Sequence, residues 1–228
     1  MSTPHRSSAR YTRLAGLLIS LPTLLAVVGC AQQPIVKLRQ SGEFHFRYGD
    51  YEAAAEDFGA IIDRAPGDWE AQYRYGQCML QLGELDAARR ALEIAAISVP
   101  NDDQVAFALA EVYFRQGDQT RLYQLLRDRA ASTGSAEPWV LLSSYALRLD
   151  DPDTANTAAL AAIEVDNGAS AVPYYQAALV AQRLGQTDLA VRRLRQGYGI
   201  NPNDTRIRTM LVELGEVPGP TIALPPGR

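Results

Sequence analysis

The amino-acid sequence predicts an all-α protein built as a solenoid of helix-turn-helix repeats. Residues that end helices recur every 34 positions, and residues suited to tight helix packing recur with the same period. The helix-ending residues inside each unit are Gly49, Gly83, Gly117, Asp151 and Gly185. The residues that close each unit are Pro66, Pro100, Gly134, Gly168 and Pro202. Since a period of this length is typical of stacked supersecondary units, we expect five repeats in a row.

Packing positions inside the units agree with this period. The eighth residue is always small: Gly42, Gly76, Ala110, Ser144 and Ala178. The twenty-fourth is always large and apolar: Phe58, Leu92, Leu126, Leu160 and Leu194. The twentieth is alanine in units one, two and five, at 54, 88 and 190, whereas units three and four carry Leu122 and Asn156. Small residues that face each other let two antiparallel helices approach closely, while the large residue fills the space toward the next pair.

This pattern is similar to the tetratricopeptide repeat, whose 34-residue units carry small residues at positions eight and twenty and proline at thirty-two. The resemblance implies a right-handed all-α solenoid with units at 35–68, 69–102, 103–136, 137–170 and 171–204. A helix at 205–214 is expected to cover the exposed face of the fifth unit, as terminal repeats require. The Pro/Gly-rich tail, 215–228, is expected to be disordered.

The segment before the first unit has the pattern of an export signal. Three arginines, at 6, 10 and 13, precede an apolar run over residues 14–28, which is shorter than a membrane-spanning helix. The run ends in Val27-Val28-Gly29-Cys30, which resembles the lipobox of bacterial lipoproteins. The resemblance implies a signal peptide at 1–29, acylation (palmitate) of Cys30, and a short tether at 30–34. The alternative is a plain signal peptide that happens to contain a cysteine.

The residue after the cysteine indicates which membrane holds the anchor. In lipoproteins of Gram-negative bacteria an aspartate at this place favours the inner membrane, and Ala31 stands there instead. The resemblance therefore implies attachment to the outer membrane on its periplasmic face. The membrane is therefore an expected partner of this chain, through the N-terminal lipid.

Composition excludes several classes of function. Residues 30–228 carry 19 basic groups against 26 acidic ones, whereas a nucleic-acid-binding protein needs a basic face. Cys30 and Cys78 are the only cysteines, so an acylated Cys30 leaves no internal disulfide. We expect no nucleic acid and no small-molecule substrate as partners. The partner is expected to be a protein of the cell envelope.

The first helix of each unit is expected to line a concave groove, by resemblance to the repeat family. The candidate peptide-binding residues of that groove are Arg39, Phe46, Arg47, Tyr73, Phe107, Arg115, Tyr175 and Arg183. The alternative is that the aromatic rings only brace neighbouring helices. As a set, aromatic rings beside arginines favour a groove for an extended or helical peptide, because these residue types often dominate interface energies. The carboxylate clamp of chaperone-binding arrays is absent, since its asparagines are missing.

Motifs of known catalytic or cofactor chemistry are missing from the sequence. It contains no nucleophile elbow, phosphate-binding loop, paired-cysteine motif or zinc-protease motif. His45 and Cys78 fall at packing positions, and the acidic stretch at 149–153 lacks the glycine and glutamate of a calcium loop. We therefore expect no enzyme activity, no cofactor and no metal.

Tetratricopeptide lipoproteins are scaffolds, and the leading hypothesis is assistance in the assembly of a secretin or pilus. The short array directly after the lipid resembles the pilotin-like lipoprotein of Tad-type (Flp) pilus systems. The alternative is an adaptor or regulator of peptidoglycan hydrolases. An enzyme that uses two carboxylates ranks third, because nothing in the sequence indicates one.

Overall fold

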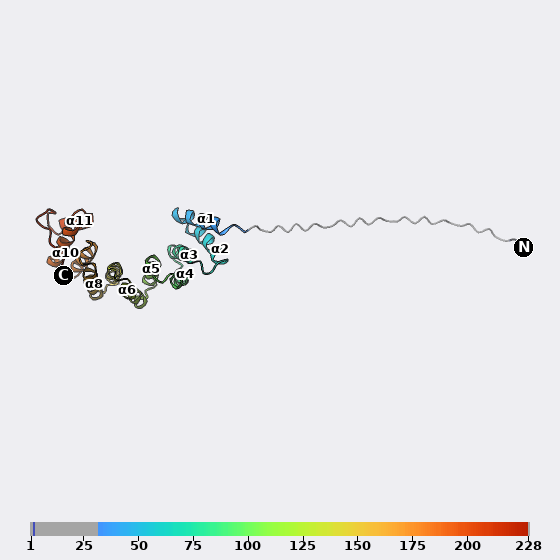
Figure 1. Ribbon diagram of the computed structural model, residues 1–228, viewed down its shortest axis with the longest axis horizontal. Helices are drawn as coiled ribbons and strands as arrows, with labels where there is room; N and C mark the ends of the chain where they lie inside the picture. Colours follow the sequence, from blue (N-terminus) through green and yellow to red (C-terminus); the bar gives the residue numbers. More distant parts are fainter. Residues whose placement is uncertain (1, 3–31, 228) are drawn as a thin grey trace. The chain divides into compact units, whose positions relative to one another are not determined.

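The structure, a computed structural model, describes Ser2 and residues 32–227, and the regular secondary structure in that part of the chain is helical. Pro34 onward forms one compact unit (Figure 1). Its helices are α1 (Ile35–Arg47), α2 (Tyr51–Ile62), α3 (Trp69–Leu82), α4 (Leu85–Ser98), α5 (Asp103–Gln116), α6 (Gln119–Thr133), α7 (Glu137–Arg148), α8 (Pro152–Asp166), α9 (Val172–Arg183), α10 (Thr187–Ile200) and α11 (Thr205–Glu213). The prediction of an all-α solenoid is confirmed. The predicted signal segment and Cys30 lie outside the described residues, apart from Ser2.

Each predicted unit contains one helix pair, a first helix (α1, α3, α5, α7 or α9) and a second helix (α2, α4, α6, α8 or α10). Helices contact chiefly those next to them in the chain, and first helices of neighbouring repeats also touch, as α3 does α5 and α7 does α9. The last helix, α11, packs on α10. It buries Ile207, Met210 and Leu211 against the end of the fifth repeat.

Aspartates start most of the helices, because their side chains satisfy backbone N–H groups that have no partner inside the helix. The aspartates whose carboxylates accept such a hydrogen bond are Asp50, Asp68, Asp102, Asp118, Asp151 and Asp204. Glycines end α3 and α5 in the left-handed conformation, with φ of 82° at Gly83 and 72° at Gly117. Glycine adopts that conformation without the steric cost other residues meet, so both turns are encoded locally.

The seam between α3 and α4 shows how the small residues act. A Cβ atom at Gly76 would lie 2.7 Å from Cγ of Leu92 and 3.3 Å from the carbonyl oxygen of Ala88. Ala88 and Leu92 are themselves fully buried. Only a glycine at 76 therefore lets the two helices approach to this distance.

The fourth repeat departs from the strict 34-residue period. Asp151 caps α8 with Pro152 after it, as expected, but the left-handed residue of the turn is Asp150, with φ of 57°. Ala155 and Ala159 are fully buried, whereas Leu160 is 41% exposed. The prediction that Leu160 packs inward, and that Asn156 replaces the seam alanine, is wrong. Relative to the strict 34-residue period, the cap Asp151 and the packing positions of this repeat lie one residue earlier in the chain.

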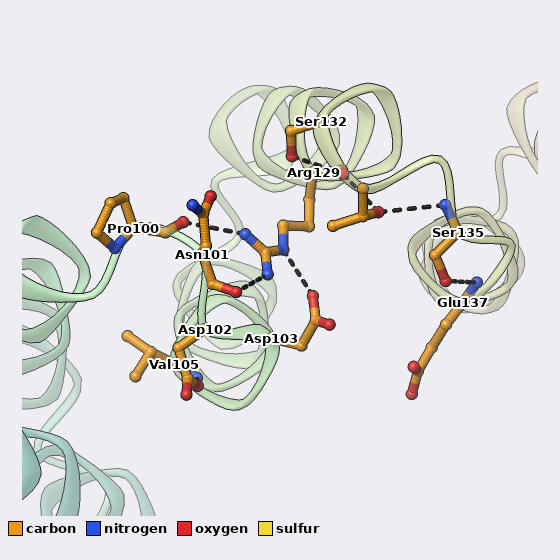
Figure 2. Close-up of polar contacts among 10 residues, drawn as sticks. Pro100, Asn101, Asp102, Asp103, Val105, Arg129, Ser132, Ser135 and Glu137 are labelled. Atoms are coloured by element: carbon orange, nitrogen blue, oxygen red, sulfur yellow. Dashed lines mark hydrogen bonds and ion pairs between the residues drawn. The ribbon is translucent and has the colours of Figure 1, made fainter.

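The third repeat carries a buried arginine where a small residue is usual. The Arg129 side chain is 5% exposed and reaches from α6 into the loop before α5, as Figure 2 shows. Its guanidinium donates to Asp103 (2.6 Å), to the carbonyl oxygen of Pro100 (3.0 Å) and to that of Asn101. Because hydrogen bonds to a charged donor are strong, Arg129 connects the second helix of repeat three to the turn between repeats two and three.

The tail is not disordered over the described residues 215–227, which corrects the expectation from composition. Leu224 donates its N–H to the carbonyl oxygen of Arg195 at 3.1 Å, and Ile222 packs on the cluster that α10 and α11 share. Composition predicted disorder because the segment is too short to bury a core of its own. It is ordered because it uses the surface of α10 instead.

Candidate functional site

A pocket of about 610 Å³ lies on the face formed by the first helices, between α5, α7 and α9. Its apolar wall consists of side chains from all three helices: Phe107, Val140, Leu141, Val172 and Pro173. The remaining lining residues are small or polar and include Ser144, Tyr145 and Gln176. This volume is in the range of sites that hold a small ligand or a few peptide side chains.

The rim of the pocket is acidic. Glu137, in the first turn of α7, is exposed, and Asp166 lies at the end of α8. The Asp166 carboxylate is held in place, because it accepts the N–H of Ser170 at 2.7 Å and its hydroxyl at 3.0 Å. No lysine or arginine is among the described residues that line the pocket. The pocket therefore favours a cation or an N–H donor beside an apolar group.

The floor at α7 is fixed by a hydrogen-bond network centred on Glu111. The Tyr145 hydroxyl donates to Glu111 at 2.9 Å, and Nε of Arg115 donates to the same carboxylate at 2.7 Å. Burial raises the pKa of Tyr145 above its usual value, and the neighbouring Glu111 raises it further. Tyr145 therefore stays a neutral donor at physiological pH. Its ring is held where it lines the pocket.

The predicted aromatic residues do not form one continuous site. Phe107 lines the pocket, whereas Phe46 and Tyr73 both lie near the Arg74 guanidinium, whose Cζ is 5.2 and 5.7 Å from the two ring centroids. Tyr175 lies under Arg206, 4.9 Å from Cζ to ring centroid, in a separate hollow of about 380 Å³ between α9 and α11. Bracing between helices thus accounts for Phe46 of α1, whereas Tyr73 lies on the same helix as Arg74. Peptide binding by the set stays a prediction.

The predicted groove arginines mostly bind other parts of the chain. Arg39 contacts Asp68, the cap of α3, at 2.5 Å and Glu70 of the second repeat at 3.0 Å. Arg115 donates to the Leu80 carbonyl oxygen at 3.0 Å, besides its bond to Glu111. Arg183 contacts Asp150 of the preceding repeat at 2.7 Å, and Arg47 is exposed. Exposed ion pairs contribute little stability, so these links chiefly align neighbouring repeats.

Sequence reasoning missed most of the pocket. With the one-residue shift of the fourth repeat, Val140 takes the position assigned by strict period to Leu141, and Ser144 that of Tyr145. The shift has a signal in the sequence, since Ala155 stands four residues after the cap Asp151, as Ala54 does after Asp50. The acidic rim residues, Glu137 and Asp166, lie at helix ends. The repeat pattern uses helix ends only to locate helix boundaries, so it does not indicate a binding role for them.

Comparison with known proteins agrees with the repeat pattern. Residues 45–112 match the tetratricopeptide-repeat family. The chain has a tetratricopeptide-repeat fold. The MamA crystal structure covers 78% of this chain and 94% of its own, with 16% identity and a TM-score of 0.58. A thermophilic tetratricopeptide-repeat protein of Thermus thermophilus covers 79% and 98%, with 19% identity and a TM-score of 0.54.

A third similar structure is YrrB, described as a tetratricopeptide-repeat protein with an unusual peptide-binding site. It covers 78% of this chain and 91% of its own, with 14% identity and a TM-score of 0.53. No relative is found among the curated proteins. At these identities the similarity shows the fold. Function has to be argued from the pocket, because such folds carry many unrelated functions.

Two features of the described residues bear on membrane and metal. Across residues 32–227, none of the helices is both long enough and apolar enough to cross a membrane. In the same part of the chain, no group of three or more His, Cys, Asp or Glu side chains is placed to hold a metal ion.

Cys78 is fully buried, and burial raises the pKa of its thiol to about 12, so it is a packing residue rather than a nucleophile. Tetratricopeptide-repeat proteins are typically non-catalytic scaffolds for protein partners.

Proposed function

We propose that this protein is a non-catalytic scaffold that binds a segment of a partner protein in the pocket between α5, α7 and α9. The observation that carries the proposal is the combination of an apolar wall and an acidic rim on the first-helix face. The peptide-binding site described for YrrB, which has the same fold, supports it. The groove thus extends over repeats three to five rather than along the whole array.

The lining defines the chemistry of the segment. Phe107, Val140 and Pro173 accept one or two apolar side chains, whose burial contributes about 1.5–3 kcal/mol each. Glu137 and Asp166 favour a lysine, an arginine or a free N–H group beside those side chains. Free arginines in the predicted groove would instead favour acidic side chains, but Arg39, Arg115 and Arg183 are bonded within the chain.

The scaffold is proposed to work at the outer membrane, held by a lipid on Cys30. The support is the basic start, the short apolar run and the Gly29-Cys30 ending. The four residues between Cys30 and Ile35 span about 14 Å when fully extended, so the first repeat would lie close to the bilayer. The partner proposed on this basis is a component of a secretin or a Tad-type pilus.

A photo-cross-linking residue at Val140 tests the pocket. In intact cells it is expected to join the protein to one envelope partner, because position 140 lines the apolar wall. The matched control is the same residue at Ile97, which is 81% exposed on α4 and distant from the pocket in the repeat order. A secretin or pilus component captured only from position 140 supports the proposal. A peptidoglycan hydrolase would favour the adaptor alternative, and identical products at both positions would exclude the pocket.

Lipidation predicts a modified N-terminus. Mass spectrometry of the protein purified from membranes is expected to show a mature chain that begins at Cys30 and carries acyl groups. Cys30→Ser is expected to leave the precursor uncut, because the chemistry requires the thiol. A mature chain with an unmodified cysteine, or one cut at another residue, would contradict the anchor while leaving the pocket proposal intact.

A further inference from the structure

The C-terminal tail lies along α10 in a way that resembles a bound ligand. Residues 222–227 contact the fifth repeat largely through atoms of the tail backbone. Nε of Arg195 donates to the Ile222 carbonyl oxygen at 2.7 Å, and the Arg195 carbonyl oxygen accepts the Leu224 N–H at 3.1 Å. The side chain and the backbone of Arg195 thus hold the tail backbone at two successive points.

Buried polar groups continue the same recognition toward the end of the tail. Nε2 of Gln196 donates to the carbonyl oxygen of Gly227 at 3.1 Å, and a guanidinium nitrogen of Arg193 donates to the same oxygen at 3.3 Å. The Tyr174 hydroxyl accepts the Gly227 N–H at 3.0 Å. Arg193, Gln196 and Tyr174 are 7%, 3% and 1% exposed. A buried guanidinium needs acceptors, since burial lowers the pKa of Arg193, and the Gly227 carbonyl oxygen supplies one.

A glycine near the end of α10 lies directly against the tail. A Cβ atom at Gly199 would collide with the carbonyl oxygen of Leu224, and its three nearest atoms all belong to the Leu224 backbone. Any side chain with a Cβ atom would clash at this position, so the glycine allows the close approach of the tail backbone.

The tail sequence suits such a surface. Proline at 225 and 226 holds the preceding residues in extended conformations, so little conformational entropy is lost on binding. Pro226 packs beside Gly168, where a Cβ atom would lie 2.8 Å from the proline ring. We call the surface formed by Gly168, Tyr174, Arg193, Gln196 and Gly199 the tail cradle. None of its residues lines the pocket between α5, α7 and α9.

We propose that the tail cradle is a second binding site, specific for an extended protein segment with a Leu-Pro-Pro-Gly core, and that residues 222–227 are its resident ligand. A partner protein that presents a segment of this chemistry competes with the tail for the cradle. Because the tail is attached, its effective concentration is of the order of millimolar, so the partner engages only when its segment binds tightly or is itself tethered nearby. The tail thus sets the affinity that a partner segment must exceed in order to bind the tail cradle.

The test uses the full chain and a fluorescent, amidated peptide of residues 220–227. In the double variant Ile222→Asp, Leu224→Pro the tail loses its apolar contact and its N–H donor, so it holds the cradle much more weakly. Fluorescence anisotropy is expected to show saturable binding of the peptide to this variant. Binding to the wild-type chain is expected to be at least tenfold weaker, because the tail occupies the cradle. Absence of binding to the double variant, or equal binding to both chains, would overturn the proposal.

Gly199→Ala in the double variant is the receptor-side control. Alanine strengthens the helix but places a methyl group where the peptide carbonyl lies, so peptide binding is expected to be lost while circular dichroism is unchanged. In the otherwise wild-type chain, Gly199→Ala is expected to raise the hydrogen exchange of the Leu224 and Gly227 amides. If both amides exchange in the wild type as fast as in an unstructured peptide, or if Gly199→Ala leaves them protected, the cradle does not hold the tail.

Discussion

Replacing Gly76 by leucine is expected to lower the free energy of unfolding by about 3 kcal/mol, the upper end of the usual cost of overpacking. The new side chain would begin 2.7 Å from Leu92 and 3.3 Å from the Ala88 carbonyl oxygen, so α3 and α4 must move apart. Leucine is a better helix former than glycine by somewhat under 1 kcal/mol, which offsets only part of this loss. Urea denaturation followed by circular dichroism measures the difference.

The same substitution at Gly59 is the control. A Cβ atom there meets only the Tyr75 ring, at an ordinary contact distance of 3.7 Å, so Gly59→Leu is expected to change stability little. Hydrogen exchange of the Gly76→Leu protein is expected to increase in repeats one to three and not in repeat five, because repeats interact only with their neighbours. Equal stability of the two leucine variants would show that the α3–α4 seam is not packed as described.

Replacing Arg129 by methionine is expected to lower the free energy of unfolding by about 2 kcal/mol. Methionine fills a similar volume but removes the donors to Asp103 and to the carbonyl oxygens of Pro100 and Asn101. Those carbonyls lie in an exposed loop, where water replaces part of the lost bonding, so the loss stays below the sum of three charged hydrogen bonds. Arg129→Lys keeps the charge but loses the planar fork of donors. Its stability is expected to lie between those of the wild type and of Arg129→Met.

Arg90→Met, at an exposed site on α4, controls for the loss of a positive charge and is expected to stay within about 0.5 kcal/mol of wild type. Amides of the loop before α5 are expected to exchange faster in Arg129→Met only. If the two methionine variants are equally stable, the buried guanidinium does not hold repeats two and three together.

The sequence predicts the repeats well where local chemistry encodes them. Caps such as Asp118 and turns such as Gly117 act within a few residues, so their positions follow from the chain alone. The fourth repeat is different, because Ser143 and Ser144 are equally acceptable neighbours by residue type. Residue type alone does not show which of the two serines faces inward. The helix cap of this repeat predicts its packing positions better than the strict period does.

The site is less predictable than the fold for a related reason. Phe107 was identified, but the Arg115 and Arg183 charges are satisfied by partners in neighbouring repeats, which no single repeat reveals. The order of the tail depends on a helix about 30 residues earlier, so proline and glycine content alone predicted disorder incorrectly. Long-range contacts decided each of these cases.

Because each repeat contacts chiefly the repeats beside it, a force applied along the array would act on one seam after another. Tension between an anchored N-terminus and a partner held in repeats three to five would be carried through every intervening seam. No long-range strand pairing within residues 32–227 shares that force, so the seams would yield one after another, each extending the protein by a repeat length. A scaffold of this kind can lengthen under load without releasing what it holds.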